Sequence, residues 1–355
     1  AEVDRILGIG IESDEDREPG FHLVAGGNEV AQVFHDFLEP AGRGTGTEDA
    51  PVPRAGDVEM PLFPIQGFLV AIVRGEVGRR DQTAHGATWM PDSQSLVFMS
   101  EHRGCDQLFR IFLNTHGSQQ ISRGVFNWNV HAVMPDGKSL LVASQNMLRP
   151  WELSLLSLED QSVTGLTGIN DDLYEKLELP EIKQRWVRAS DGKMIHNWVI
   201  YPPNFDKSKK WPMITYCQGG PQGQVGQWFS YRWNFHLMAA NDYVILAVNR
   251  RGLPGFGQAW NDEISGDWGG QAMQDILAAT DDMKTEPYID GERVAGVGAS
   301  FGGYTAYWLM GHHEDRFCCL VSHCGVFNLE SWYGSTEELF FPNWDLGGPY
   351  WNSTR

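Results

Sequence analysis

The sequence predicts a chain of two parts, with several blades of a β-propeller in residues 1–180 and an α/β domain with a largely parallel sheet in residues 181–355. Two patterns lead to this prediction. The first half of the chain repeats a unit of two strands joined by a turn, whereas the second half alternates short apolar runs with helical segments. The composition, with 42% hydrophobic residues, 40 Gly and 18 Pro, is typical of a packed globular protein that is rich in turns.

The charge and the cysteine pattern exclude some classes of partner. The chain has 46 acidic and 27 basic residues, which gives a formal net charge of −19 at pH 7. Such a field repels phosphate backbones, so we expect no nucleic-acid partner. No run of about 18 apolar residues occurs, so we expect no membrane span. The five cysteines form no CxxC pair, and no spacing of His, Cys and Asp resembles a metal site, so we expect neither a metal nor another cofactor.

Two similar segments carry the repeat in the first half. Ala87–Asp92 and Ser95–Phe98 form one copy, and Ala132–Asp136 and Ser139–Val142 form the other. Each copy is typical of a strand, a Pro-Asp turn and a second strand, and the two turn prolines lie 44 positions apart. A period of about 40–45 residues with this pattern indicates propeller blades. Two unrelated hairpins with a common turn are the alternative, which the matching apolar positions around the turns disfavour.

The pattern changes at about residue 181. Two alternating segments, Arg185–Ala189 and Met194–Tyr201, predict a hairpin that opens a new domain, and the surrounding segment Glu181–Lys210 is the expected junction between the two parts. The apolar runs that follow are short and β-branched, as in strands that are covered on both faces. We expect strands at Met213–Tyr216, Tyr243–Val248, Val294–Val297 and Cys318–Val321, and helices at Tyr231–Ala240, Ala272–Lys284 and Tyr304–Met310.

A serine motif follows the third of these strands. The residues Gly298-Ala299-Ser300-Phe301-Gly302 have the pattern GxSxG, and they lie between a predicted strand and a predicted helix. In this position the motif is typical of a nucleophile elbow, in which the serine occupies a strained turn and the glycines avoid clashes with neighbouring backbone. A glycine-rich turn around a buried serine is the alternative. The elbow predicts that Ser300 is a nucleophile and that the domain is an α/β hydrolase.

A serine nucleophile also needs donors for the oxyanion that forms during acyl transfer. The residue after the nucleophile supplies one backbone N–H, so we expect Phe301 to act in this way. A second donor is expected from Gln218-Gly219-Gly220-Pro221, the loop that follows the strand at Met213–Tyr216. A plain turn is the alternative for this loop.

The base and the acid that complete a catalytic triad cannot be traced in the sequence. In the α/β-hydrolase fold the acid and the histidine follow the nucleophile on later loops. The histidines after the serine are His312 and His313, at the end of the next predicted helix, and His323, which we interpret as part of the wall or the packing. We therefore expect the triad Asp and His to lie beyond Arg355 and the α/β-hydrolase domain to be incomplete at its C-terminal end.

Four motifs together resemble the prolyl oligopeptidase family of serine peptidases. They are Tyr216–Gly223, Asn249–Gly257, Gly298–Tyr304 and Phe340–Asp345, and the resemblance covers about residues 85–355. It implies an α/β-hydrolase domain preceded by a propeller of about seven or eight blades, part of which would precede Ala1. It also implies the cleavage of short peptides with release of N-terminal dipeptides.

The resemblance also implies roles for individual residues. It matches Phe301 to the residue whose amide serves the oxyanion hole. Other members have Tyr or His where Gln218 stands, so the side-chain amide of Gln218, or backbone N–H groups alone, would replace that donor. The aromatic residues Phe327, Trp332 and Tyr333 match the region that lines the pocket for the residue before the scissile bond, and core packing is the alternative for them.

The leading hypothesis is a serine exopeptidase that forms an acyl-enzyme on Ser300, with a propeller that restricts entry to short peptides. An esterase-type α/β hydrolase and a propeller-containing binding protein without catalysis are the alternatives, and a homodimer is left open. The resemblance favours the bacterial periplasm as the location, with the cytoplasm as the alternative.

A serine without its base is a weak nucleophile. Residues 1–355 alone are therefore expected to show little or no hydrolysis of dipeptidyl p-nitroanilides, which is measured by the absorbance of released p-nitroaniline. A rate clearly above that of the Ser300→Ala chain would contradict this expectation, because it would show that a base acts within these residues.

Overall fold

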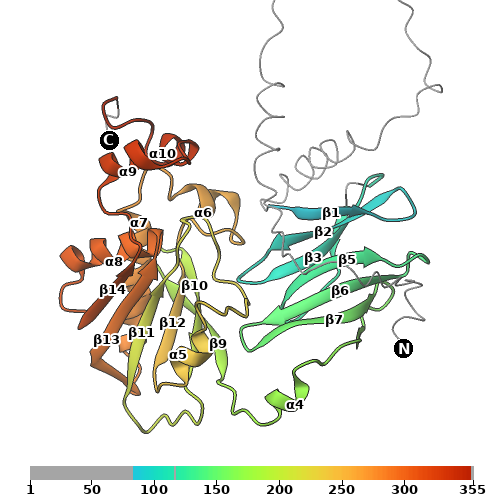
Figure 1. Cartoon of the computed structure of the whole chain (residues 1–355), viewed down its shortest axis with the longest axis horizontal. Coiled ribbons are helices and arrows are strands. Elements are labelled where there is room, and N and C mark those ends of the chain that lie inside the picture. Colours follow the sequence, from blue (N-terminus) through green and yellow to red (C-terminus); the bar gives the residue numbers. More distant parts are fainter. Residues whose placement is uncertain (1–82, 116, 353–355) are drawn as a thin grey trace, which may run out of the picture. The chain divides into compact units, whose positions relative to one another are not determined.

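The computed structural model describes residues 83–115 and 117–352 (Figure 1). Within these residues the chain forms two four-stranded antiparallel sheets, followed by a six-stranded mixed sheet that is accompanied by helices. The predicted blades in residues 1–82 lie outside the described residues. No helix in the two described ranges has the length and the apolar character that crossing a bilayer requires.

The two antiparallel sheets have the same strand order, in which each strand pairs with the next one along the chain. The strand–turn–strand unit of the repeat is therefore confirmed in both copies, whereas their place in a propeller stays a prediction. The strands of the first sheet are β1 (His85–Trp89), β2 (Ser95–Glu101), β3 (Asp106–Phe112) and β4 (Gly117–Gln120), and those of the second sheet are β5 (Asn127–Val133), β6 (Ser139–Asn146), β7 (Arg149–Ser157) and β8 (Val163–Gly165).

The turn aspartates explain why both units turn at the same place. Asp92 accepts hydrogen bonds from the backbone N–H groups of Gln94 and Ser95, at 2.8 and 3.0 Å. Asp136 accepts one from the backbone of Lys138 at 2.9 Å. A short acceptor side chain that binds the backbone two residues further on stabilises a tight turn.

The two antiparallel sheets share one hydrophobic core. Val97 and Leu108 of the first sheet are buried in the same cluster as Leu140 and Val142 of the second sheet. Alternate residues of a strand point to opposite faces, so each sheet offers one set of apolar side chains to the other. Packing of this kind, sheet against sheet, is also what neighbouring propeller blades require.

The third sheet forms the α/β part. Its strand order is β14, β13, β11, β12, β10 and β9, in which β14 to β12 are parallel and β10 and β9 form an antiparallel hairpin at one edge. The predicted strands and the largely parallel sheet are thus confirmed, with shifted strand ends. The strands are β9 (Ile182–Arg188), β10 (Met194–Ile200), β11 (Trp211–Cys217), β12 (Val244–Asn249), β13 (Ile289–Ala299) and β14 (Cys319–His323).

Both faces of this sheet are covered, as strand β12 illustrates. Leu246 belongs to the cluster that contains residues of α7 (Gln271–Lys284) and α8 (Phe301–His312). Its neighbour Ile245 belongs to a separate cluster, which includes residues of α5 (Phe235–Ala239) (Figure 1). A strand that is covered on both faces needs no polar face, which explains the continuous apolar runs in the sequence.

The helix predicted at Tyr231–Ala240 is wrong in its first four residues, because polar side chains set a later start. The hydroxyl of Ser230 accepts a hydrogen bond from the N–H of Trp233 at 2.9 Å, which closes a turn. The side chain of Asn234 then caps α5 by accepting from the N–H of Leu237 at 2.9 Å.

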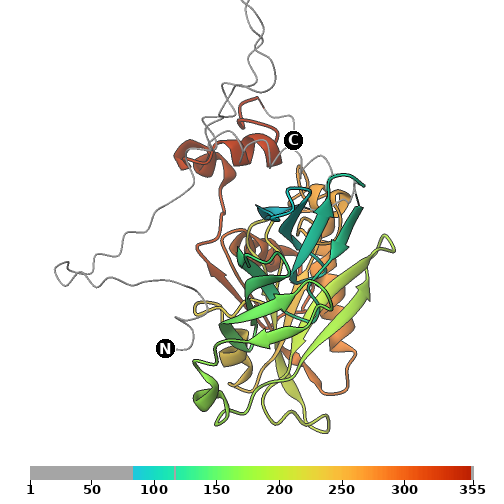
Figure 2. The same ribbon diagram turned by 90° about the vertical axis from the view of Figure 1, so that its right-hand side faces the viewer.

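The sequence pattern does not predict the short helices α4 (Asp171–Tyr174), α6 (Gln258–Asp262), α9 (Leu329–Ser335) and α10 (Phe340–Asp345). Figure 2 shows α9 and α10 beyond one end of the sheet.

A buried asparagine connects the antiparallel sheets with the α/β part. The side-chain oxygen of Asn127, at the start of β5, accepts hydrogen bonds from the backbone N–H groups of Asp106 at 3.0 Å and Gln227 at 3.1 Å. Asp106 belongs to β3, and Gln227 belongs to the segment after β11. Because Asn127 is fully buried, an apolar residue in its place would leave these two N–H groups without their acceptor.

Asn127→Leu is therefore expected to lower the free energy of unfolding by about 2–5 kcal/mol, because the N–H groups of Asp106 and Gln227 lose their acceptor. Equilibrium unfolding in urea measures this change. Asn129→Leu is the matched control, because Asn129 is an exposed residue of the same strand and its replacement should change the stability by less than about 0.5 kcal/mol. Equal losses in the two variants would contradict this account.

A second contact between the same parts involves a carboxyl group with a raised pKa. The side-chain amide of Gln224 donates to the carboxylate of Asp106 at 2.5 Å. Burial and then the nearby charge of Glu101 raise the pKa of Asp106 to about 6. Folding therefore favours the protonated form of Asp106. The free energy of unfolding decreases as the pH rises from about 4 through about 6, because the carboxyl group of the folded chain must then ionise in a buried place.

Asp106→Asn, which cannot ionise, is consequently expected to be more stable than the wild type by on the order of 2–3 kcal/mol at pH 7, and by little at pH 4. Urea unfolding of both chains at a series of pH values tests this. If the difference in stability between the two chains did not change with pH, the raised pKa of Asp106 would be refuted.

Candidate active site

Ser300 lies on a strained turn between β13 and α8. Its φ and ψ angles are 57° and −119°, a conformation that costs a residue with a β-carbon about 1–3 kcal/mol. Its N–H donates to the carbonyl oxygen of His323 in β14 at 3.0 Å, and the residue is exposed. The strand-to-helix turn that the motif predicts is therefore present, and its serine reaches the surface.

Close backbone packing requires the glycines around Ser300. A β-carbon at Gly302 would lie 2.1 Å from the carbonyl oxygen of Cys217, the last residue of β11. A β-carbon at Gly298 would lie 2.4 Å from the carbonyl oxygen of Gly302. Both distances are far below van der Waals contact, so only glycine allows α8 to begin this close to β11.

The loop Gln218–Pro221 lies against the elbow. A β-carbon at Gly219 would lie 3.0 Å from the carbonyl oxygen of Ala299 and 3.9 Å from the β-carbon of Ser300. Phe301 is the first residue of α8, where backbone N–H groups have no acceptor within the helix. The structure thus brings Ser300, the first turn of α8 and the loop after β11 together.

A cavity of about 370 Å³ opens at Ser300. Gln218 and Gly219 line it together with the serine, so the predicted loop forms part of its wall. Its volume is in the range of pockets that bind small ligands. Much of the remaining wall is aromatic, and comes from Tyr216, Trp228, Trp233 and Phe235.

The aromatic residues predicted from the resemblance lie elsewhere among the described residues. Phe327 is 75% exposed, and neither it nor Trp332 nor Tyr333 lines the cavity at Ser300. Trp332 packs on Trp268, with ring centres 5.6 Å apart. Their role in a substrate pocket stays a prediction. The sequence reasoning missed the aromatic wall of the cavity, in which Tyr216 precedes the glycine-rich loop and the other three residues follow it.

No described side chain forms a hydrogen bond with the hydroxyl of Ser300. His323 contacts the serine through its backbone, and its ring centre lies 6.1 Å from that of Trp233. The ring of His312 stacks on Trp308 at 4.1 Å. The structure therefore places no general base at the serine within the described part of the chain.

A buried arginine lies beneath the loop. Arg250 follows β12 and is fully buried. Its guanidinium donates to the carbonyl oxygens of Gln218 at 3.2 Å and of Pro221 at 3.3 Å, and lies 4.5 Å from the centre of the Phe301 ring. Burial lowers the pKa of Arg250 to about 10, so the group is charged at neutral pH. Arg250 therefore connects the loop with the start of α8.

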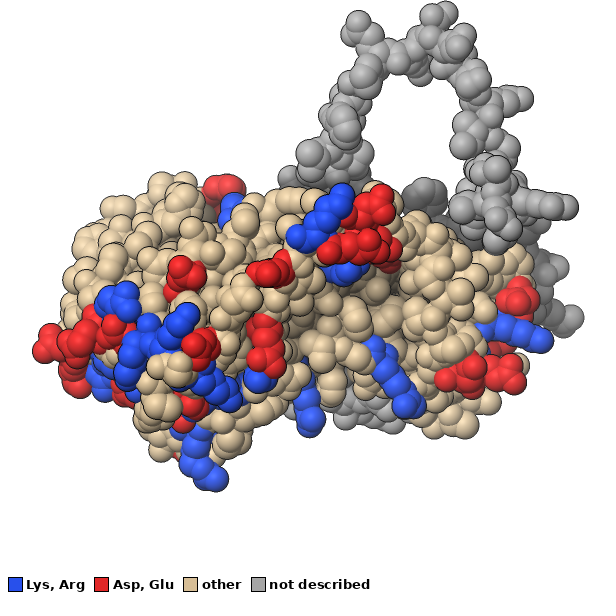
Figure 3. Space-filling model, turned by 90° about the horizontal axis from the view of Figure 1, so that it is seen from below, with Lys and Arg blue, Asp and Glu red and all other residues tan. Residues whose placement is uncertain are grey.

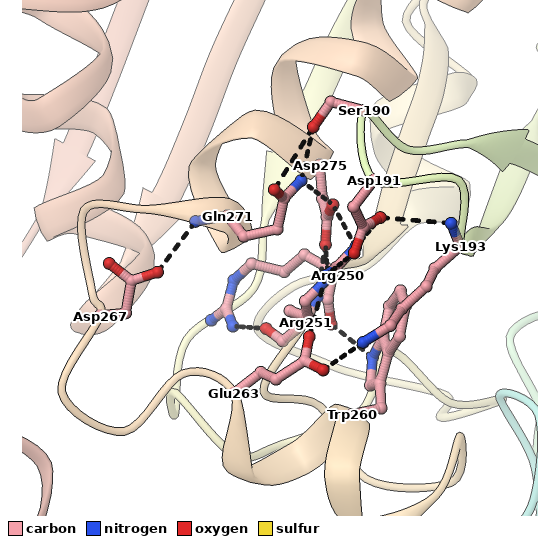
Figure 4. Close-up of polar contacts among 10 residues, drawn as sticks. All are labelled: Ser190, Asp191, Lys193, Arg250, Arg251, Trp260, Glu263, Asp267, Gln271 and Asp275. Carbon is pink, nitrogen blue, oxygen red and sulfur yellow. Dashed lines mark hydrogen bonds and ion pairs between the residues drawn. The ribbon is translucent and has the colours of Figure 1, made fainter.

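The neighbouring Arg251 forms ion pairs with three carboxylates of this region (Figure 4). Its side chain donates to Asp275 on α7 at 3.1 Å, to Asp191 in the β9–β10 turn at 2.5 and 2.8 Å, and to Glu263 after α6 at 2.9 Å. These hydrogen bonds hold the pKa of Asp191 well below its usual range. Arg250 forms no ion pair with the described residues, and the charge of Asp275 acts on it only from a distance.

Several known proteins with similar sequences are named as peptidases. Residues 229–355 match the model of the prolyl oligopeptidase family. The chain is 44% identical to dipeptidyl-peptidase 5 of Porphyromonas gingivalis over 263 residues. These residues make up 74% of this chain and 38% of that protein. It is 33% identical over 282 residues to dipeptidyl-peptidase 5 of Aspergillus fumigatus, with 78% of this chain and 39% of that protein covered. The chain thus spans less than half the length of these curated relatives.

Solved structures give a consistent result. The chain is similar to the acylaminoacyl peptidase of Pyrococcus horikoshii, with a TM-score of 0.67 and 25% identity over 76% of this chain and 42% of that one. It is also similar to an acylaminoacyl peptidase in complex with Z-Gly-Gly-Phe-chloromethyl ketone, with a TM-score of 0.66, 26% identity and the same shares of the two chains. These similarities support the predicted α/β-hydrolase fold.

Two glycines of the same helix provide a test of the packing at the elbow. Gly302→Ala is expected to lower the free energy of unfolding by about 2–4 kcal/mol, because its β-carbon would overlap the carbonyl of Cys217. Gly311→Ala is the control, since a β-carbon there meets nothing within 4 Å, and it should raise the stability by up to about 1 kcal/mol. Urea unfolding measures both. Similar effects of the two substitutions would argue against the close packing.

Proposed function

Because residues 229–355 belong to the prolyl oligopeptidase family, we propose that the chain carries the nucleophile and the oxyanion-binding part of a serine peptidase site. In this proposal Ser300 forms an acyl-enzyme with short peptides, and N-terminal dipeptides are released, in keeping with the name dipeptidyl-peptidase 5 of the relatives. The observation that carries the proposal is the strained turn at Ser300, which opens the residue to a cavity beside the first turn of α8.

The chemistry is an acyl transfer in two steps. The Oγ atom of Ser300 bonds to the carbonyl carbon, and its proton passes to a general base. The carbonyl oxygen becomes an oxyanion, which the N–H of Phe301 and a donor of the segment Gln218–Gly219 would bind. The C–N bond then breaks, the amine leaves with the proton, and water releases the acyl group from the serine in the second step.

The electrostatics of the site favour an oxyanion at this position. The N-terminal end of α8 carries a partial positive charge, and the guanidinium of Arg250 lies beneath the loop and forms no ion pair with the described residues. Both act in a partly buried region, where charges interact more strongly than in water. The described residues therefore favour the stabilisation of the oxyanion, whereas proton transfer from Ser300 needs a group that they do not place there.

Covalent labelling with a fluorophosphonate tests the proposal, because this probe bonds to nucleophilic serines. At alkaline pH, where hydroxide can take the proton of the hydroxyl group, the label is expected on Ser300, located by peptide mass spectrometry, and should be lost in Ser300→Ala. Ser208→Ala is the control, because Ser208 is exposed and does not line the cavity. Labelling that persists in Ser300→Ala would contradict the assignment of the nucleophile.

The pH dependence of the same labelling tests whether a base acts on Ser300 in this chain, since none of the described residues is placed to do so. Without a base, the rate should rise with the hydroxide concentration up to about pH 10. If instead the rate levelled off above about pH 7, a histidine with a pKa near 6.5 would be acting on Ser300.

A further inference from the structure

Among the described residues that line the cavity at Ser300, one carries a full charge. Arg232 belongs to the segment between β11 and α5, and it is exposed. The other lining residues are aromatic, small or uncharged and polar. Its backbone N–H bonds to Ser230 at 3.3 Å, but within the described part of the chain the guanidinium of Arg232 has neither an ion pair nor a hydrogen bond. It is therefore free to bind a ligand.

We propose that Arg232 binds the carboxylate of short peptides in this cavity, so that the site prefers anionic peptides to neutral ones. The inference rests on the proposed function, because it assigns a substrate class to the same site. A guanidinium donates two parallel hydrogen bonds that match the two oxygens of a carboxylate. The C-terminal carboxylate of a tripeptide and an acidic side chain both have this chemistry.

The aromatic wall strengthens such a contact. The ring of Tyr216 lies 5.6 Å from that of Trp233 and 4.8 Å from that of Phe235, so these side chains form a continuous surface. Burial raises the pKa of the Tyr216 phenol to about 12, so the wall carries no negative charge at neutral pH. A carboxylate beside an apolar wall is less hydrated, and its attraction to a guanidinium is stronger there than in bulk water.

The net charge of the chain does not attract anionic peptides, so a preference for them depends on the local charge of Arg232. A formal charge of −19 repels anionic peptides at long range, but physiological salt limits this repulsion to about 8 Å. On the face in Figure 3, Lys and Arg are interspersed with Asp and Glu, and no broad positive patch gathers anions there. The charge inside the cavity is therefore what distinguishes a peptide carboxylate from a neutral amide.

Peptide binding, rather than turnover, tests the proposal. Trp228 and Trp233 line the cavity, so tryptophan fluorescence reports binding, and Ser300→Ala prevents hydrolysis. The probes are Ala-Ala-Ala with a free carboxylate, Ala-Ala-Ala-amide, and Ala-Glu-Ala-amide, which separates a terminal carboxylate from an acidic side chain. In low salt the free acid is expected to bind about threefold to tenfold more tightly than the neutral amide.

Three variants locate the effect. Arg232→Gln should reduce the difference between acid and amide to less than about twofold, and Arg232→Lys should retain part of it. Arg188→Gln, which removes an exposed arginine outside the cavity lining, should leave it unchanged. Equal binding of acid and amide by the wild type, no binding of either, or an unchanged difference in Arg232→Gln would overturn the proposal.

Two further measurements test the carboxylate site separately from the folding of the Arg232→Gln variant and from the proposed function. If Arg232→Gln does not fold, the wild type still gives an answer, because about 0.5 M salt should remove most of the difference and a difference that persists there would contradict an ion pair. If fluorophosphonate labelling of Ser300 fails while the difference between acid and amide remains, the proposed function is wrong and the carboxylate site stands.

Discussion

The close approach of Gly302 to the carbonyl oxygen of Cys217 is the constraint on which the site depends. Any β-carbon at position 302 would overlap this oxygen, so the start of α8 can lie against the end of β11 only with glycine. Because the loop Gln218–Pro221 begins at the next residue, the same contact brings the loop to Ser300. The proposed nucleophile and the expected oxyanion donors are thus placed by backbone packing, with little dependence on flexible side chains.

Arg250 adds an electrostatic element to this arrangement. A buried guanidinium that bonds only to carbonyl oxygens costs stability compared with an apolar side chain of similar size. Here the cost is offset in part by hydrogen bonds to the loop and by the ring of Phe301. The neighbouring Arg251 binds the nearby carboxylates, and this division leaves a positive charge beneath the expected oxyanion. Such a distribution of charge fits a site that stabilises a negative transition state.

The sequence predicted those features that local patterns determine. The strands of the α/β part follow from short apolar runs, the paired hairpins from the Pro-Asp turns, and the position of Ser300 from a motif between a strand and a helix. The start of α5 was not predicted correctly. The side chains of Ser230 and Asn234 accept hydrogen bonds from backbone N–H groups, and the helix begins after them.

Features that join distant residues could not be predicted in this way. Arg250 contacts Gln218, 32 positions earlier, and Arg251 contacts Asp191, 60 positions earlier. No periodicity connects such pairs, since strand order alone brings them together. The same holds for the cavity, whose aromatic walls and single arginine are recognised only once the segment after β11 is seen to fold over Ser300.

The most direct test of this account is the crystal structure of the chain with a phosphonate bound covalently to Ser300. The account predicts that one phosphonyl oxygen lies about 2.7–3.1 Å from the backbone nitrogen of Phe301 and at a similar distance from a donor of the segment Gln218–Gly219. An adduct whose oxygens all point away from both groups, toward solvent, would contradict the proposal that these residues form an oxyanion hole.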